Sequence, residues 1–179
     1  ARAIDFALTA QVRILNLSLS GPRDLLVSRL LQRAEEQGIV AVAAVPPGNT
    51  NDGFPATLET VIAVFPSDRN GQVYGTVPPG AGVALAAPGV EILTTLPQQI
   101  YDFVSGSSLA TAHVSGLLAL LLERFPALSP QELRQALRTA GGSAHRAGHN
   151  PPAIPDACAL LNRLASAPLC SVSEREQQS

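Results

Sequence analysis

The composition of this chain fits one domain with a large core and excludes several classes of function. Of its 179 residues, 46% are hydrophobic and 15% are charged, and the formal net charge is −2. All 12 basic residues are arginine and they form no cluster, so we expect no nucleic-acid-binding surface. The longest apolar stretch, residues 109–122, is interrupted by polar side chains and is too short to span a membrane, so we expect a buried helix there.

Strand-like and helix-like segments alternate along the chain, and local signals mark several of their ends. Asp24 is placed to open a helix that stops at Gly38. Residues 129–132 form a capping box, with Ser129 as the helix N-cap and Glu132 as its partner. In chain order we expect a helix at 1–10, a strand at 12–20, a helix at 25–37, strands at 39–45, 61–66, 82–89 and 99–106, and helices at 109–122, 130–140 and 156–164.

This alternation predicts an α/β fold with a doubly wound, mostly parallel sheet and helices on both faces. The strands at 39–45 and 61–66 are continuously apolar, as strands buried on both faces are. Ligands in such sheets bind beyond the carboxyl ends of the strands, so the loops after Val45 and Val104 are candidate site loops. We expect residues 1–165 to form the domain and the polar tail, residues 166–179, to be disordered.

Two cysteines, Cys158 and Cys170, lie near the C-terminal end of the chain. They either form a disulfide in an oxidising compartment or remain two free thiols, and the sequence leaves both alternatives open. No histidine lies between them, so we expect no zinc site, and no other metal ligand set or cofactor motif stands out.

A pair of serines, Ser107 and Ser108, stands at the start of the long apolar helix, after Gly106. A serine in this place either caps the helix or acts as a nucleophile beside unpaired backbone N–H groups. The nucleophile elbow of α/β-hydrolases requires a glycine two residues after the serine, and Ala110 stands there instead. The sequence therefore argues against that class of esterase.

The stretch GSSLATAHVSG, residues 106–116, resembles the subtilisin-like serine protease (subtilase) signature GTSMATPHVAG. Residues 3–22 resemble the helix and substrate-binding strand of that family, and residues 38–64 resemble the segment that carries its oxyanion asparagine. The three segments occur in the family's order. The resemblance therefore implies the C-terminal half of a subtilisin-like catalytic domain, which is a partial domain.

The resemblance assigns roles to individual residues. Ser108 matches the nucleophile, and Ser107 stands where the family has threonine. Leu109 and Ala112 replace the methionine and proline of the signature. The resemblance also implies a strand that would pair with the substrate main chain and a segment that would line the first specificity pocket. The strand residues are Ser18, Leu19 and Ser20, and the pocket residues are Ala43, Ala44 and Val45.

The oxyanion donor that the resemblance implies depends on the alignment. Alignment on the Gly-Asn dipeptide places the asparagine at Asn49, which we prefer. A gapless alignment places it at Pro47, which has no donor and predicts a much weakened enzyme. A third interpretation makes Asn49 and Asn51 ordinary turn residues in a loop rich in proline and glycine.

The general base and its aspartate have no match in the chain. His113 follows Ser108 on the same helix, and the corresponding histidine of the family is structural. Asp5 lacks the family's sequence context, and His145 and His149 follow the serine in a loop. In the family the Asp and His precede the serine.

The resemblance thus implies a serine endopeptidase that forms an acyl-enzyme on Ser108, with Asp and His supplied by an N-terminal half outside this chain. The 179 residues alone should then be inactive. The alternative is a non-catalytic pseudoprotease or peptide-binding module. The implied partners are a peptide or protein substrate and that N-terminal half. Secretion or export, and calcium binding, are implied by the resemblance only.

Overall fold

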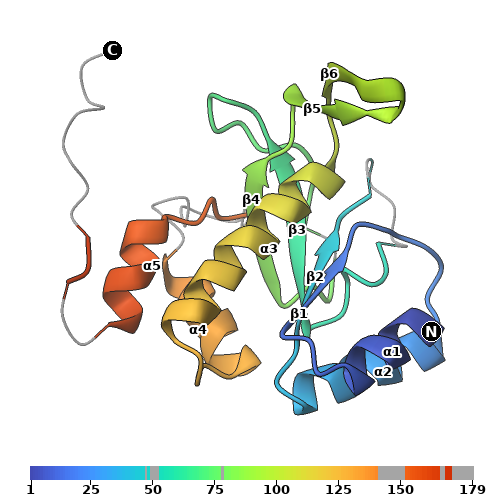
Figure 1. The fold of residues 1–179 in the computed structure, drawn as a ribbon, viewed down its shortest axis with the longest axis vertical. Helices are drawn as coiled ribbons and strands as arrows, with labels where there is room; N and C mark the ends of the chain where they lie inside the picture. Colours follow the sequence, from blue (N-terminus) through green and yellow to red (C-terminus); the bar gives the residue numbers. More distant parts are fainter. Residues whose placement is uncertain (47, 49–52, 78, 141–151, 166–167, 171–179) are drawn as a thin grey trace.

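A four-stranded, all-parallel sheet forms the centre of the fold (Figure 1). The structure is a computed structural model, and it describes residues 1–46, 48, 53–77, 79–140, 152–165 and 168–170. The strand order in the sheet follows chain order, with β1 at one edge and β4 at the other. The predicted α/β class with a mostly parallel sheet is therefore confirmed. The strands are β1 (Ile14–Leu17), β2 (Val40–Ala44), β3 (Val61–Ser67) and β4 (Val83–Pro88).

Helices cover both faces of this sheet, as predicted. Because side chains alternate along a strand, β2 sends Val40 and Val42 into one core and Ala41 and Ala43 into the other. One core is shared with α3, α4 and α5, and the other with α1 and α2. No helix in the described part of the chain is long and apolar enough to cross a membrane. The helices are α1 (Arg2–Thr9), α2 (Leu25–Glu36), α3 (Ser107–Arg124), α4 (Pro130–Ala140) and α5 (Ala157–Leu164).

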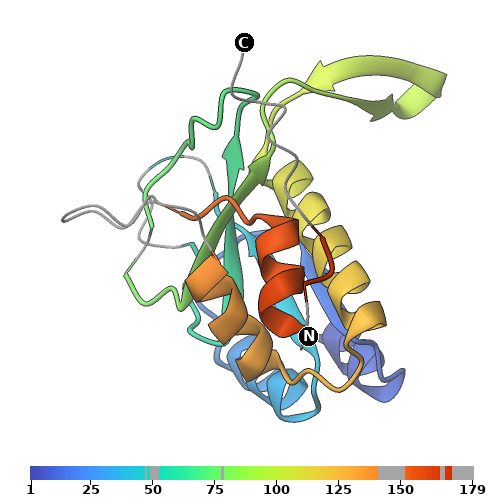
Figure 2. The same cartoon turned by 90° about the vertical axis from the view of Figure 1, so that its left-hand side faces the viewer.

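A separate antiparallel hairpin, made of β5 (Ile92–Leu96) and β6 (Ile100–Val104), projects from the body of the molecule (Figure 2). The sequence predicts β6 but not its partner β5. The turn between them, the 3₁₀ segment η1 (Pro97–Gln99), explains the omission. Gln98 and Gln99 adopt φ values of 68° and 62°, a conformation for which glycine or asparagine is the usual signal. Because glutamines occupy these two positions, the sequence carries no turn signal that would indicate a hairpin.

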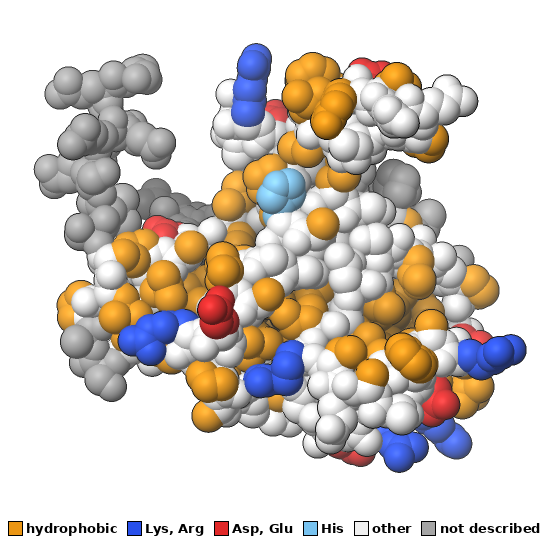
Figure 3. Space-filling model, in the orientation of Figure 1, with side chains coloured by type: hydrophobic (Ala, Val, Ile, Leu, Met, Phe, Trp, Pro, Cys, Tyr) orange, Lys and Arg blue, Asp and Glu red, His pale blue; other side chains and the backbone are white. Residues whose placement is uncertain are grey.

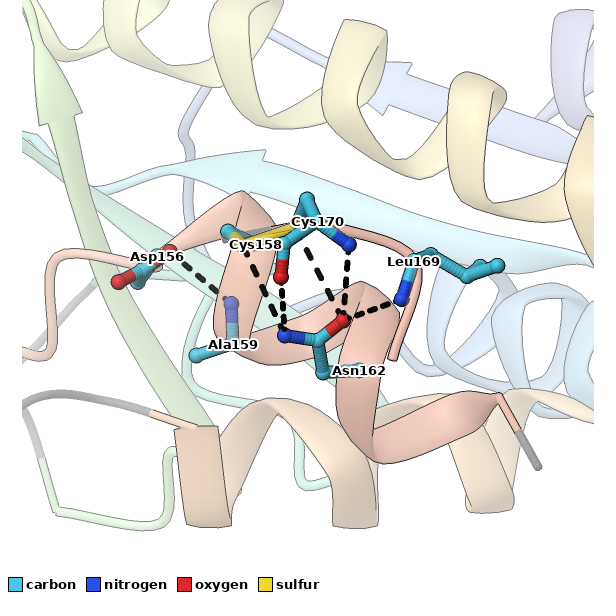
Figure 4. Close-up of a disulfide and its surroundings, with 6 residues drawn as sticks. All are labelled: Asp156, Cys158, Ala159, Asn162, Leu169 and Cys170. Atoms are coloured by element: carbon cyan, nitrogen blue, oxygen red, sulfur yellow. Dashed lines mark hydrogen bonds between the residues drawn. A yellow bond between two sulfur atoms is a disulfide. The ribbon is translucent and has the colours of Figure 1, made fainter. Parts of the chain in front are cut away.

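A disulfide between Cys158 and Cys170 ties the segment after α5 back onto that helix, which decides between the two alternatives left open above (Figure 4). The Asn162 side chain accepts the N–H groups of Leu169 and Cys170 and donates to the Cys170 carbonyl. Residues 168–170 are therefore held against α5. The remainder of the predicted polar tail lies outside the described residues, so its disorder stays a prediction.

The capping box at the start of α4 forms as predicted. The Glu132 N–H donates to Ser129 Oγ, and the Ser129 N–H and hydroxyl both donate to the Glu132 carboxylate. These hydrogen bonds lower the pKa of Glu132 below its ordinary value of 4.5. A lowered folded-state pKa stabilises the fold above the unfolded pKa, and this contribution is lost as the pH falls through the folded-state pKa.

We therefore expect Glu132→Gln to lower the melting temperature at neutral pH and to have less effect in acid. The gap between wild type and variant should shrink as the pH falls below 4.5, the ordinary pKa of the group. Melting curves followed by circular dichroism across this range measure the gap. Ser129→Ala removes only the two hydrogen bonds of the Ser129 hydroxyl and keeps the backbone N–H bond to Glu132, so it should show a smaller gap than Glu132→Gln. A difference in melting temperature that stays constant with pH would contradict the lowered pKa of Glu132.

A nearly buried ion pair joins α4 to α2. Arg134 donates to the Glu35 carboxylate and to the Thr60 carbonyl, and the two charged side chains are 11% and 12% exposed. Removing one charge leaves the other buried and unpaired, so Arg134→Leu should lower the free energy of unfolding by about 3 kcal/mol. Urea denaturation measures this loss. The double variant Glu35→Leu/Arg134→Leu should lose less than the sum of the single variants, and the exposed Arg138→Leu should change little.

Candidate active site

The candidate nucleophile lies at the first turn of α3, the helix that crosses the sheet. The N-cap position is Gly106, and no side chain caps this helix end among the described residues. Neither Ser107 nor Ser108 therefore has the capping role that was the alternative interpretation. Ser108 is exposed, and its backbone N–H belongs to the uncapped first turn, where an anion is stabilised by the helix dipole.

The side chain of Ser18, just after the end of β1, contacts the start of α3. The Ser18 hydroxyl lies 3.3 Å from the Ser108 carbonyl oxygen and 2.9 Å from Asn16 Oδ1, and its one O–H is shared between these two acceptors. The structure thus brings together two residues that lie 90 positions apart in the chain. Sequence analysis assigned no role to Asn16; the signal available was an exposed amide in an otherwise apolar strand.

The predicted substrate-binding segment, Ser18, Leu19 and Ser20, runs along the surface from the end of β1. All three residues are exposed, and the Leu19 side chain is 59% exposed. The next residue, Gly21, donates its N–H to the Phe54 carbonyl in an isolated antiparallel bridge. The segment is therefore fixed at both ends and open to solvent between them. Its role in binding a substrate strand stays a prediction.

The predicted pocket residues lie at the C-terminal end of β2, and all three are buried. The exposed fraction rises from 0% at Ala43 to 5% at Ala44 and 8% at Val45. Ala43 packs in the core between the sheet and the helices α1 and α2. Any contact with a substrate side chain would therefore come from the Val45 end of the strand. The pocket itself stays a prediction.

Both candidate oxyanion positions, Asn49 and Pro47, lie outside the described residues, as does Asn51. The two ends of the loop that carries them are described and lie close together, because a Cβ added to Gly53 would lie 3.6 Å from Pro46 Cδ. Phe54, the residue after Gly53, is the one that bridges to Gly21 beside the substrate-binding segment. The choice between Asn49 and Pro47 remains open.

His113 is turned away from Ser108. Five residues along an α-helix correspond to a rotation of about 140°, which carries the ring to another side of α3. His113 Nδ1 lies 3.0 Å from the Leu109 carbonyl of the preceding turn. The ring borders a small hollow with Pro88, Leu117 and Ile154. This placement fits the structural role expected from the sequence, and His145 and His149 lie outside the described residues.

Backbone contacts at the base of the β5–β6 hairpin hold the residues just before Ser108, a feature that sequence analysis missed. The Gly106 N–H donates to the Gly89 carbonyl at 2.7 Å, and the Glu91 N–H donates to Ser105 Oγ at 2.9 Å. A Cβ at Gly89 would lie 2.7 Å from Pro66 Cβ and 2.9 Å from the Gly106 oxygen. Only glycine fits this position without moving the start of α3.

The described residues include no group of three or more His, Cys, Asp or Glu side chains that would hold a metal ion. Calcium is also bound by backbone and amide carbonyl oxygens, so calcium binding stays a prediction of the resemblance.

The subtilase family model matches residues 1–154 of the chain. The chain belongs to the subtilase family. Subtilisin DY of Bacillus licheniformis is 34% identical over 140 residues, which cover 75% of this chain and 51% of that protein. A thermostable alkaline protease of Halalkalibacterium halodurans is 34% identical over 143 residues, which cover 76% of this chain and 38% of that protein.

Solved structures agree with the family assignment. Sphericase superposes on this subtilase chain with a TM-score of 0.63 at 27% identity, covering 80% of this chain and 54% of the other. The prenylagaramide maturation protease PagA gives a TM-score of 0.76 at 24% identity, covering 92% of this chain and 66% of the other, and supports the fold alone. The chain spans about half the length, or less, of the curated relatives it matches.

The close contact at Gly89 makes a prediction about this subtilase chain. Gly89→Ala should lower the free energy of unfolding by about 1–3 kcal/mol, because the new methyl group would overlap backbone and Pro66 atoms that cannot rotate away. Urea denaturation measures the change. Gly116→Ala is the matched control: a Cβ there meets nothing within 4 Å, so this variant should gain up to about 1 kcal/mol of helix stability. Equal effects of the two variants would refute the steric argument.

Proposed function

We propose that this chain supplies the nucleophile of a serine endopeptidase, with Ser108 as the attacking residue. The observation that carries the proposal is the contact between the Ser18 hydroxyl and the Ser108 carbonyl. This contact places the exposed segment after β1 beside the uncapped first turn of α3, in a chain of the subtilase family. A peptide laid along Ser18 to Ser20 would bring a carbonyl group to Ser108.

In the proposed reaction, Ser108 Oγ attacks the peptide carbonyl while a histidine takes its proton. The tetrahedral oxyanion accepts a hydrogen bond from the Ser108 backbone N–H and, in the preferred alignment, from the Asn49 side chain. The C–N bond then breaks as the histidine returns the proton to the leaving amine. Water hydrolyses the acyl-enzyme on Ser108 and frees the serine for another cycle.

The histidine and aspartate come, in this proposal, from a polypeptide segment outside the 179 residues. His113 is turned away from Ser108 and is held against the preceding turn of its own helix. Among the described residues β1 is an edge strand, and this edge together with the outer side of α3 is the proposed receiving surface. Parallel sheets are covered on both faces, and a helix that is apolar all round is normally buried. The outer side of α3 carries Ala112, Gly116, Ala119 and Leu120, and Leu120 is 66% exposed.

We also propose that the protein is secreted or exported. Its relatives include the minor extracellular protease Epr of Bacillus subtilis, 33% identical over 142 residues. The Cys158–Cys170 disulfide supports an oxidising compartment, because thiols in reducing compartments are rarely paired. Peptides or proteins are the proposed substrates.

The neighbouring serines provide a matched test. A fluorophosphonate probe should label Ser108 when the chain is part of a protein with the complementing segment, and peptide cleavage should accompany labelling. Ser108→Ala should abolish labelling and lower kcat/KM by roughly a thousandfold or more, whereas Ser107→Ala should retain both. Labelling is read by mass spectrometry of the probe-modified peptide, and cleavage by a quenched fluorescent peptide.

Three outcomes would count against the proposal. Full activity of the isolated chain, lost on Ser108→Ala, would show that no second segment is needed. An equal loss of labelling and cleavage in Ser107→Ala would contradict the assignment of Ser108 as the nucleophile. No labelling of the completed protein, with peptide binding intact, would favour the non-catalytic peptide-binding module instead.

A further inference from the structure

The segment after residue 154 carries a feature that lies outside the match to the subtilase family. The family model ends at residue 154, whereas α5 and the Cys158–Cys170 disulfide follow it. The two cysteines are the only ones in the chain. Reduction of their disulfide therefore gives two thiols that have no other partner within the chain.

α5 covers part of the core that α3, α4 and the sheet share. Leu160 is fully buried in this core, and Leu161 and Leu164 pack against it as partly buried side chains. Hydrophobic side chains already gather at the surface around α4 and α5, at the lower left of Figure 3. Displacement of α5 would therefore add newly exposed core residues to a surface that is already apolar.

The disulfide lies on the other side of the same helix. Cys158 and Asn162 are four residues apart and share one face of α5, whereas Leu160 is rotated from Cys158 by about 200°. Residues 168–170, which we call the strap, lie against the Cys158–Asn162 face (Figure 4). α5 is thus held between the core on one side and the strap on the other.

α5 depends on these contacts because it is too short to be stable alone. It has eight residues, and helices shorter than about 12 residues are marginal in water. Its first turn is supported by Asp156, which accepts the Ala159 N–H. Its second turn contains Asn162, the residue that is joined to the strap. Release of the strap should therefore loosen the second turn first.

Hydrogen bonds alone do not keep the strap closed. Asn162 makes three hydrogen bonds with the backbone of Leu169 and Cys170. The net contribution of three such bonds is similar in size to the conformational entropy lost when three residues become ordered. A disulfide between residues 12 apart in the sequence favours the closed state by roughly a hundredfold. The covalent bond therefore decides whether the strap is closed.

The disulfide is within reach of a small reductant. Cys158 and Cys170 are both half-buried, and the neighbouring Ala159 and Leu169 are exposed. A thiolate of a dithiol attacks one sulfur atom, and the second thiol of the reductant then displaces this sulfur and closes a cyclic disulfide. The dithiol loses two electrons and two protons, and Cys158 and Cys170 gain them as two thiols.

We propose that the Cys158–Cys170 disulfide is a redox-sensitive clasp. Oxidation closes the strap over α5, and reduction by a dithiol releases the strap and loosens α5, while the sheet and α2 keep their structure. In an exported protein the clasp closes when the chain leaves a reducing compartment. The proposal is independent of the peptidase reaction, because it involves neither Ser108 nor a substrate.

Hydrogen exchange followed by mass spectrometry tests the clasp on the 179-residue chain, before and after treatment with dithiothreitol. Amides of α5 should exchange at least about tenfold faster after reduction, because the closed state is no longer favoured by the covalent bond. Amides of α2 should change by less than about twofold. α2 is the internal control, since it packs in the core on the opposite face of the sheet. Labelling with a maleimide counts the thiols released.

Two variants separate the covalent bond from the hydrogen bonds. Cys158→Ser/Cys170→Ser should show fast exchange of α5 without reductant and no response to dithiothreitol. Asn162→Ala keeps both cysteines, so exchange of the Leu169 and Cys170 amides should rise while α5 still responds to dithiothreitol.

Three results would overturn the proposal. The first is unchanged exchange of α5 after both thiols have been released. The second is an equal rise in α2 and α5, because reduction would then unfold the whole domain. The third is a disulfide that dithiothreitol does not reduce in the folded chain, since the clasp requires access to the sulfur atoms. The measurement on the unchanged chain decides between these results even if the double serine variant does not fold.

Discussion

The packing of α3 across the parallel sheet is the constraint on which the rest of the structure depends. This helix contacts all four strands, and Leu118 and Leu121 on its inner side are 0% and 1% exposed. Burying one leucine contributes about 2 kcal/mol, so several such side chains fix the helix axis firmly. The position of Ser108 is therefore set by buried leucines that lie two to four turns further along the helix. The core thus sets the axis of the helix that carries the candidate site, and the hydrogen bond from Gly106 to Gly89 holds the residues that precede it.

Much of the fold was predictable because its signals are local. The continuously apolar strands at 39–45 and 61–66, the Asp24 cap and the Ser129–Glu132 capping box each depend on a few neighbouring residues. The hairpin was only half predictable. Its turn contains two glutamines with positive φ, a conformation that glycine usually adopts, so the sequence gives no turn signal. No residue of β5 is buried, so this strand also lacks the apolar pattern of a core strand.

The candidate site was predictable where it rests on a contiguous motif, and less so where it rests on contacts between distant segments. The GSSLATAHVSG stretch pointed to Ser108, and the resemblance paired it with Ser18 to Ser20. Only the structure shows the hydrogen bond from Ser18 to the Ser108 carbonyl and the second contact of Ser18 with Asn16, because the first joins segments far apart in the sequence. The oxyanion position was ambiguous for a simple reason, since two adjacent prolines shift the alignment between Pro47 and Asn49.

The anchored base of the β5–β6 hairpin has a consequence for protein engineering. Its hydrogen bonds, from Gly106 to Gly89 and from Glu91 to Ser105, lie at the opposite end of the ribbon from the turn at Pro97–Gln99. The tip can therefore be lengthened, shortened or exchanged while the backbone that leads into Ser108 stays clamped. The hairpin can therefore be exchanged as a unit. Libraries of variants confined to residues 93–103 would change the surface near the candidate nucleophile without moving the helix that carries it.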